Sequence, residues 1–84
     1  MERVDYNPER VTIVRARYGG LYEPGTWVAF ACWPEDLSPD WNADDATCAG
    51  FFAERADETG GGDSPQEAYA DLLQRLAARR KRLR

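Results

Sequence analysis

Five carboxylates and one tryptophan gather between residues 34 and 47, a stretch without any basic residue. The candidate partner-binding residues in it are Glu35, Asp36, Asp40, Trp41, Asp44 and Asp45. Carboxylates spaced along a loop can bind the Arg and Lys side chains with which a protein normally holds phosphates. An exposed tryptophan is favoured as an anchor at interfaces. The alternative interpretation is a solvated connection with Trp41 folded back onto the protein, and the sequence leaves both open.

Catalytic chemistry is difficult to assemble from these residues. The chain has no histidine, which removes the commonest general base and the commonest metal ligand. Cys32 and Cys48 are expected to be buried and inert, the first in an apolar strand and the second beside carboxylates. Residues 40–45 look like the start of a calcium loop, but Asp45 and Phe51 replace its required Gly and Glu. We therefore predict no catalytic residue, no metal site and no cofactor.

The C-terminus carries a charge of the opposite sign. Residues 75–84 hold six of the eleven basic residues and none of the fifteen acids. Cations there complement a helix dipole, and Asp71 with Arg75 makes a favourable i,i+4 pair. Six basic residues are more than these helix contacts require. The sequence therefore leaves open a secondary basic surface made of Arg79, Arg80, Lys81, Arg82 and Arg84. Because the acidic body repels phosphates, direct binding of nucleic acid is disfavoured.

The hydrophobic pattern predicts the strands that position these residues. Alternating apolar residues predict strands at 11–18 and 26–33, joined as a hairpin. The second of these is apolar on both faces and is expected to be central. The long acidic loop at 34–47 follows, with room for one helical turn after Ser38-Pro39. A third strand is predicted at 49–57, and residues 59–63 are expected to be a flexible turn.

A capping motif predicts the C-terminal helix at 64–83. Ser64 can cap the helix and Pro65 suits its first position, while Glu67 is placed to reach back to the N–H of Ser64. Apolar residues then recur at three- and four-residue spacings. The predicted fold class is α+β, a three-stranded antiparallel sheet with one C-terminal helix packed on one face (β-β-β-α). We expect a single domain over 1–84, with an N-terminal arm at 1–10.

No stretch is apolar over the length of a membrane span, and the charged N-terminus lacks the apolar run of a signal peptide. With only two cysteines, the chain also has no disulfide framework. These features predict a cytoplasmic protein that does not interact with membranes.

Two motifs resemble those of HicB-like antitoxins. The strand and Phe-Pro-Asp-Leu turn of that family are similar to Trp27-Val28-Ala29-Phe30 followed by Trp33-Pro34-Glu35-Asp36-Leu37. Its Gly-Asp-Thr-Pro-Glu-Glu-Ala helix start is similar to Gly62-Asp63-Ser64-Pro65-Gln66-Glu67-Ala68. The resemblance implies a degraded ribonuclease-H-like β-β-β-α core that blocks a toxin binding double-stranded RNA. The chain departs from the pattern in its long loop at 34–47 and in having no DNA-binding module before Arg84.

In size, acidity and lack of catalytic residues, the chain is also similar to phage anti-CRISPR proteins. This resemblance implies a non-catalytic inhibitor whose acidic, nucleic-acid-mimicking surface blocks a nucleic-acid-handling protein or complex, and it is the function we predict. The expected partner is a basic nucleic-acid-binding protein, either a Cas protein or complex or a toxin. A HicB-like antitoxin and a small RNA-binding module using the basic tail remain alternatives. The predicted state is a monomer or a dimer.

Overall fold

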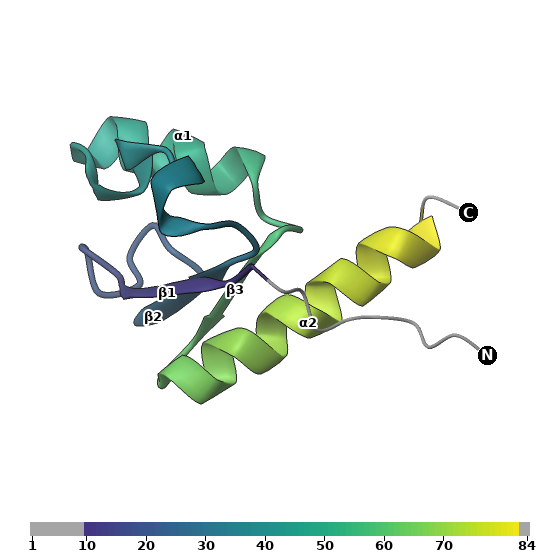
Figure 1. Cartoon of the computed structure of the whole chain (residues 1–84). Coiled ribbons are helices and arrows are strands. Elements are labelled where there is room, and N and C mark those ends of the chain that lie inside the picture. The colour runs from purple at the N-terminus through teal and green to yellow at the C-terminus, as the bar shows by residue number, and fades with distance from the viewer. Residues whose placement is uncertain (1–9, 83–84) are drawn as a thin grey trace.

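The computed structural model describes the backbone of residues 10–82 and the side chains of residues 10–79. An antiparallel sheet of three strands lies between two helices, one on each face (Figure 1). The elements in chain order are β1 (Thr12–Arg15), β2 (Trp27–Phe30), the short 3-10 helices η1 (Pro34–Asp36) and η2 (Pro39–Asn42), α1 (Asp45–Glu54), β3 (Thr59–Gly62) and α2 (Pro65–Arg82). The predicted arm at 1–10 lies outside the described residues apart from Arg10.

Strands β1 and β2 form the predicted hairpin. They pair antiparallel, with Thr12 opposite Phe30 and Arg15 opposite Trp27. Each strand is shorter than predicted, and β1 is followed by a turn that includes Gly19 and Gly20. Both glycines have positive φ angles, 66° and 102°, which side-chain-bearing residues rarely adopt. The glycines therefore encode the turn, but β1 ends at Arg15, three residues before the predicted end at Tyr18.

Strand β2 is central, as its two apolar faces predict. Val28 and Phe30 are buried in the core beneath α1, whereas Ala29 is buried in the core beneath α2. The alternation of β1 is confirmed too, since Val14 packs toward α1 and Ile13 toward α2. Each face of the sheet therefore has its own apolar cluster.

The third strand is not where it was predicted. Residues 45–54 form the helix α1, so the prediction of a strand at 49–57 is wrong. Cys48, Phe51 and Phe52 are buried at i, i+3 and i+4, and the two Phe rings lie with centroids 5.0 Å apart on the same side of the helix. A strand would have pointed adjacent phenylalanines to opposite faces. Their joint burial against Phe30 favours the helix.

Strand β3 is the glycine-rich stretch Thr59–Gly62, for which a flexible turn was predicted. It pairs antiparallel with β2, with Ala29 opposite Gly60. The backbone of α2 lies directly against it: a Cβ atom on Gly60 would meet the backbone of Leu72 and Ala68. Only a residue without a side chain permits this approach, so tertiary packing explains a strand made of residues with low β-propensity.

Helix α2 begins as predicted. The Glu67 N–H donates to Ser64 Oγ at 3.1 Å, and Pro65 is the first helical residue. The Glu67 carboxylate accepts from the N–H of Asp63 at 2.9 Å, one residue before the expected N–H of Ser64. The helix packs mainly on β3 and β2, with Ala68 and Leu72 fully buried. The predicted fold class, α+β with a β-β-β-α order of sheet and C-terminal helix, is confirmed.

Replacing Ser64 with Ala removes the cap of α2. We expect the free energy of unfolding to fall by about 1 kcal/mol, since one N–H at the helix start loses its acceptor. Urea unfolding followed by circular dichroism measures the change. Ser64→Asp restores an acceptor at the same place and should recover most of the loss. Equal stability of Ser64→Ala and the parent would contradict the role of this hydroxyl.

No helix in residues 10–82 combines the length and the apolar composition required to cross a bilayer.

Candidate functional site

The carboxylates singled out in the sequence lie on an ordered segment. We call residues 34–45 the acidic segment; it comprises η1, η2 and the first residue of α1. The predicted loop at 34–47 is thus largely helical, and the turn expected after Ser38-Pro39 is η2, where the Asp40 N–H donates to Ser38 Oγ at 3.3 Å. The exposed carboxylates of the segment are Glu35, Asp36, Asp40, Asp44 and Asp45.

Contacts with the rest of the fold hold the acidic segment in place. Trp41 is half-buried, with its ring centroid 6.4 Å from that of Phe30. Arg17 Nη1 donates to the Asn42 carbonyl at 2.6 Å, and the Tyr18 hydroxyl donates to the Ala43 carbonyl at 2.7 Å. Trp41 thus packs back onto the protein, as one of the two interpretations expected. Its role in binding a partner stays a prediction.

The five carboxylates fall into two groups. Asp44 and Asp45 lie at the start of α1 and have local contacts: the Thr47 hydroxyl lowers the pKa of Asp44, and Asp45 hydrogen-bonds to Tyr22. Burial raises the pKa of Tyr22, and the charge of Asp45 raises it further. Negative charge at a helix N-terminus also complements the helix dipole. These two residues therefore have a structural explanation.

Glu35, Asp36 and Asp40 lie in the first turns of the short helices η1 and η2, and no side-chain partner is found for them among the ion pairs of the described residues. The ion pairs found among the described residues are Arg55–Glu54, Arg75–Asp71 and Arg79–Glu58. None of these pairs involves the acidic segment. The negative charge of η1 and η2 is accordingly available to a partner.

The basic end of α2 contacts the protein's own backbone and acids. Arg79 pairs with Glu58 at 3.2 Å, and Arg75 pairs with Asp71 at 2.9 Å and donates to the Ala56 carbonyl. Both arginines thereby hold the turn between α1 and β3. Of the other predicted basic residues, Arg80, Lys81 and Arg82 belong to α2 by backbone only, their side chains lying outside the described residues, as does all of Arg84.

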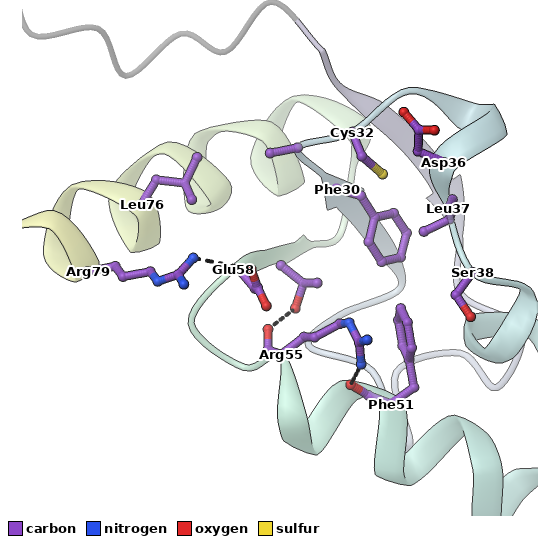
Figure 2. Close-up of a pocket in the computed structure, with 12 residues that line it drawn as sticks. Phe30, Cys32, Asp36, Leu37, Ser38, Phe51, Arg55, Glu58, Leu76 and Arg79 are labelled. Carbon is purple, nitrogen blue, oxygen red and sulfur yellow. Dashed lines mark hydrogen bonds and ion pairs between the residues drawn. The ribbon is translucent and has the colours of Figure 1, made fainter.

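A pocket of about 350 Å³ opens between α1, η1 and the second half of α2 (Figure 2). Its apolar side chains come from β2, η1, α1 and α2 or the residues next to them. Its charged side chains come from η1, from the turn between α1 and β3, and from α2. The lining residues are Phe30, Ala31, Cys32, Asp36, Leu37, Ser38, Phe51, Arg55, Glu58, Thr59, Leu76 and Arg79. The volume is within the range of small-ligand and anchor-residue sites. Asp36 belongs both to this pocket and to the acidic segment.

Neither cysteine is an activated thiol. Cys48 is fully buried, and its Sγ lies 3.4 Å from the Trp41 carbonyl oxygen. Burial raises the pKa of the Cys48 thiol, and the nearby Glu23 carboxylate raises it further. Cys32 is half-exposed, contrary to the expected burial; desolvation followed by the charge of Asp36 raises its pKa. Both shifts lower the thiolate fraction and so disfavour nucleophilic attack.

We therefore expect a large difference between the thiols in reaction with Ellman's reagent at pH 8. Cys32 should react in the native protein more slowly than a free thiol, and Cys48 only after unfolding. Cys32→Ser and Cys48→Ser variants assign the two phases. Two equally fast thiols in the native protein would contradict this expected difference in reactivity.

The raised pKa of the Cys48 thiol in the folded protein also makes stability depend on pH. The stabilisation from the neutral, buried thiol is complete below the thiol pKa of the unfolded chain and is lost as pH rises through the folded pKa.

Nothing in the described part of the chain gathers three or more Asp, Glu, Cys or His side chains in an arrangement that could hold a metal ion. The stretch that looked like a calcium loop is η2 followed by the start of α1. The acids of this stretch are exposed and form a charged surface.

The pocket was missed in the sequence because residues 49–57 were assigned to a strand. Only a helix brings Phe51 and Arg55 together, with the guanidinium 4.3 Å from the ring centroid. A signal was present: Asp44 is a favourable N-cap, and Cys48, Phe51 and Phe52 have helical spacing. The buried carboxylate of Glu23 was also missed, since the segment between the strands at 11–18 and 26–33 was predicted only as the connection of a hairpin.

Comparisons with protein-family models, with curated proteins and with solved structures gave no match. A function for this chain is therefore inferred from its own residues and their geometry.

Proposed function

We propose that this chain is a non-catalytic inhibitor that covers the basic, nucleic-acid-binding surface of a Cas protein or complex. The observation that carries the proposal is the acidic segment: exposed carboxylates stand on η1, η2 and the start of α1, with no basic residue among them. Carboxylates bind the Arg and Lys side chains of such a surface through charge-assisted hydrogen bonds. Nucleic acid is then excluded because its phosphates need the same side chains.

The anchoring of the acidic segment supports this role. Trp41, through Phe30, and the hydrogen bonds from Arg17 and Tyr18 hold the segment against the sheet. A segment already ordered in the free protein loses less conformational entropy on binding than a mobile loop would. The negative net charge of −4 also accelerates encounter with a basic partner, most strongly at low salt.

Direct binding of RNA finds less support. Phe30 is buried, and Trp27 is half-buried with the Arg15 guanidinium 5.7 Å from its ring centroid. Base stacking requires open aromatic faces, whereas here a helix lies on each face of the sheet, and Trp33, which is 46% exposed, lies beyond the end of β2 (Figure 1). Among the described basic side chains, Arg75 and Arg79 already pair with acids. A protein partner suits the exposed charge of the described residues better.

A second candidate is an antitoxin of the HicB-like kind. The specific observation in its favour is that β3 leads directly into the Ser64-capped α2, so that η1, η2 and α1 are an insertion between the second and third strands. The β-β-β-α order that the resemblance implies is retained around that insertion. The partner would then be a toxin whose RNA-binding surface is basic, and the acidic segment would bind it by the same chemistry.

The proposal is tested by reversing two charges of the acidic segment. The unmodified protein should displace labelled nucleic acid from a purified, guide-loaded Cas complex or, for the second candidate, labelled double-stranded RNA from a purified toxin. Glu35→Lys/Asp40→Lys should weaken displacement at least about tenfold at 150 mM salt, which corresponds to about 1.4 kcal/mol. Competition measured by fluorescence anisotropy gives the inhibition constants.

The matched control is Glu54→Lys/Asp63→Lys, which changes the net charge equally at two exposed positions outside the acidic segment. Its displacement of nucleic acid should stay within about twofold of the parent, because neither carboxylate belongs to the acidic segment, and losing the exposed Glu54–Arg55 pair should change stability little. Circular dichroism verifies that both variants fold. Equal loss of displacement in both variants would show that the effect depends only on net charge. Failure of the unmodified protein to displace nucleic acid from either the Cas complex or the toxin would refute the proposal.

A further inference from the structure

Apolar side chains make up half of the lining of the pocket beside the acidic segment. Leu37 follows η1, Phe30 ends β2, Phe51 lies on α1 and Leu76 on α2, and all four side chains line the space (Figure 2). Side chains from both core clusters therefore reach its walls. Leu37 and Leu76 are partly exposed at this junction of the two helical layers, whereas Phe30 and Phe51 are only 3% and 5% exposed.

Three of the four charged residues in the pocket are already engaged by the fold. Arg79 pairs with Glu58 at 3.2 Å, which neutralises both at the α2 end. The Arg55 guanidinium lies over the Phe51 ring at 4.3 Å and donates to the Phe51 carbonyl at 3.4 Å. These contacts extend the apolar wall with the flat side of a guanidinium. They do not make a dedicated site for an anion.

Asp36 is the exception. Its carboxylate is exposed, it takes part in no ion pair found among the described residues, and it lies at the opposite end of the pocket from Arg79 (Figure 2). The charge of Asp36 at this rim is thus negative and continuous with that of Glu35, and Arg10, whose charge acts on the neighbouring Cys32, forms no ion pair with Asp36 among those found in the described residues. The complementary group is a cation placed beside an apolar side chain.

We infer that this pocket receives one apolar side chain of the partner, such as Leu or Phe, whose neighbouring Lys or Arg meets Asp36. The inference rests on the proposed function and specifies the recognition segment: an apolar residue adjacent to a basic one, on or beside the basic surface. Interfaces draw most of their binding energy from a few such anchors enclosed in pockets, while charges around the rim set orientation and rate. The acidic segment supplies the rim, and the partly exposed Leu37 and Leu76, together with the small exposed parts of Phe30 and Phe51, supply the anchor site.

Short peptides test the inference without an identified partner. The probes are Ac-Ala-Lys-Leu-Lys-Ala-NH2, the same peptide with Ala in place of Leu, and the same peptide with Glu in place of both Lys. Titration of ¹⁵N-labelled protein should show the lysine–leucine peptide binding at least fivefold tighter than the alanine version. The shifted amides should include those of Leu37, Phe51, Thr59 and Leu76. The glutamate peptide should not bind measurably.

Two variants separate the anchor from the charge. Leu76→Gln should remove the advantage of leucine over alanine, whereas Asp36→Asn should weaken both lysine peptides about equally. Equal binding of the leucine and alanine peptides by the parent would overturn the anchor site, and tighter binding of the glutamate peptide would assign the pocket to an anion instead. The two proposals fail separately. If the Glu35→Lys/Asp40→Lys variant lost displacement but the parent did not prefer the leucine peptide, the proposed inhibition would stand and the anchor site would be rejected. If that variant kept displacement and the parent preferred the leucine peptide, only the proposed inhibition would be rejected.

Discussion

Gly60→Ala is expected to lower the free energy of unfolding by at least about 3 kcal/mol, a large part of the total for a domain of this size. A Cβ atom at Gly60 would lie 2.7 Å from Leu72 Cα and nearer still to Leu72 N and Ala68 O. These are backbone atoms, which cannot rotate away as a flexible side chain can. To admit one methyl group, α2 must move off β3, and Ala68 and Leu72 would then lose their burial.

Gly50→Ala is the matched control, with the opposite expected sign. Gly50 is exposed in the middle of α1, has no atom within 4 Å of a built Cβ, and does not have a positive φ angle. The same methyl group should therefore stabilise the protein by about 0.5–1 kcal/mol through helix propensity. Urea unfolding measured by circular dichroism and tryptophan fluorescence gives both values. If Gly60→Ala were as stable as the parent, the direct contact of α2 with β3 would be wrong.

Glu23→Ala is expected to cost about 3 kcal/mol, since two backbone N–H groups would lose a charged acceptor in a buried place. Glu23 is only 6% exposed. Its two carboxylate oxygens accept from the N–H of Tyr18 at 3.0 Å and from the N–H of Gly20 at 3.1 Å. The carboxylate thereby closes the loop between β1 and β2. Tyr18 in turn donates to Ala43, so the loss should also loosen the acidic segment.

Two control variants, one at Glu23 and one at an exposed carboxylate, separate the effect of charge from the effect of side-chain size. Glu23→Gln keeps the size but turns one acceptor into a donor facing an N–H group, and about 1–2 kcal/mol should be lost. Glu35→Gln, at an exposed carboxylate, should change stability by less than about 0.5 kcal/mol. Thermal and urea unfolding give the comparison. A Glu23→Ala variant as stable as Glu35→Gln would show that this carboxylate does not hold the loop.

Stability and binding accordingly depend on different residues. Ser64, Gly60 and Glu23 hold the scaffold together through a helix cap, a backbone contact and a buried carboxylate. Glu35 and Asp40 contribute charge but no ion pair among the described residues. Substitutions in the first group should reduce binding only as far as they unfold the protein or loosen the acidic segment. Substitutions in the second group should reduce binding in a fully folded protein.

The sequence by itself determined the parts of the fold that local rules govern. Gly19 and Gly20 form the turn that follows β1, the two apolar faces of 27–30 make β2 central, and Ser64-Pro65 starts α2. Each follows from the φ preference, side-chain period or hydrogen-bonding capacity of a few neighbouring residues. The acidic character of residues 34–45 is likewise a property of composition and could be predicted without coordinates.

Tertiary structure alone decided the third strand and the pocket. Thr59–Gly62 has little intrinsic tendency to be a strand, and it becomes one because α2 approaches its backbone closely and β2 offers an unpaired edge. Phe51 and Phe52 could belong to a strand or a helix until Phe30 and Trp41 gave them a common surface to pack on. The same packing brings Arg55 and Asp36 to one pocket from segments that are separate in the chain. A short apolar run fits both the helical and the strand repeat, and burial against residues distant in the chain decides between them.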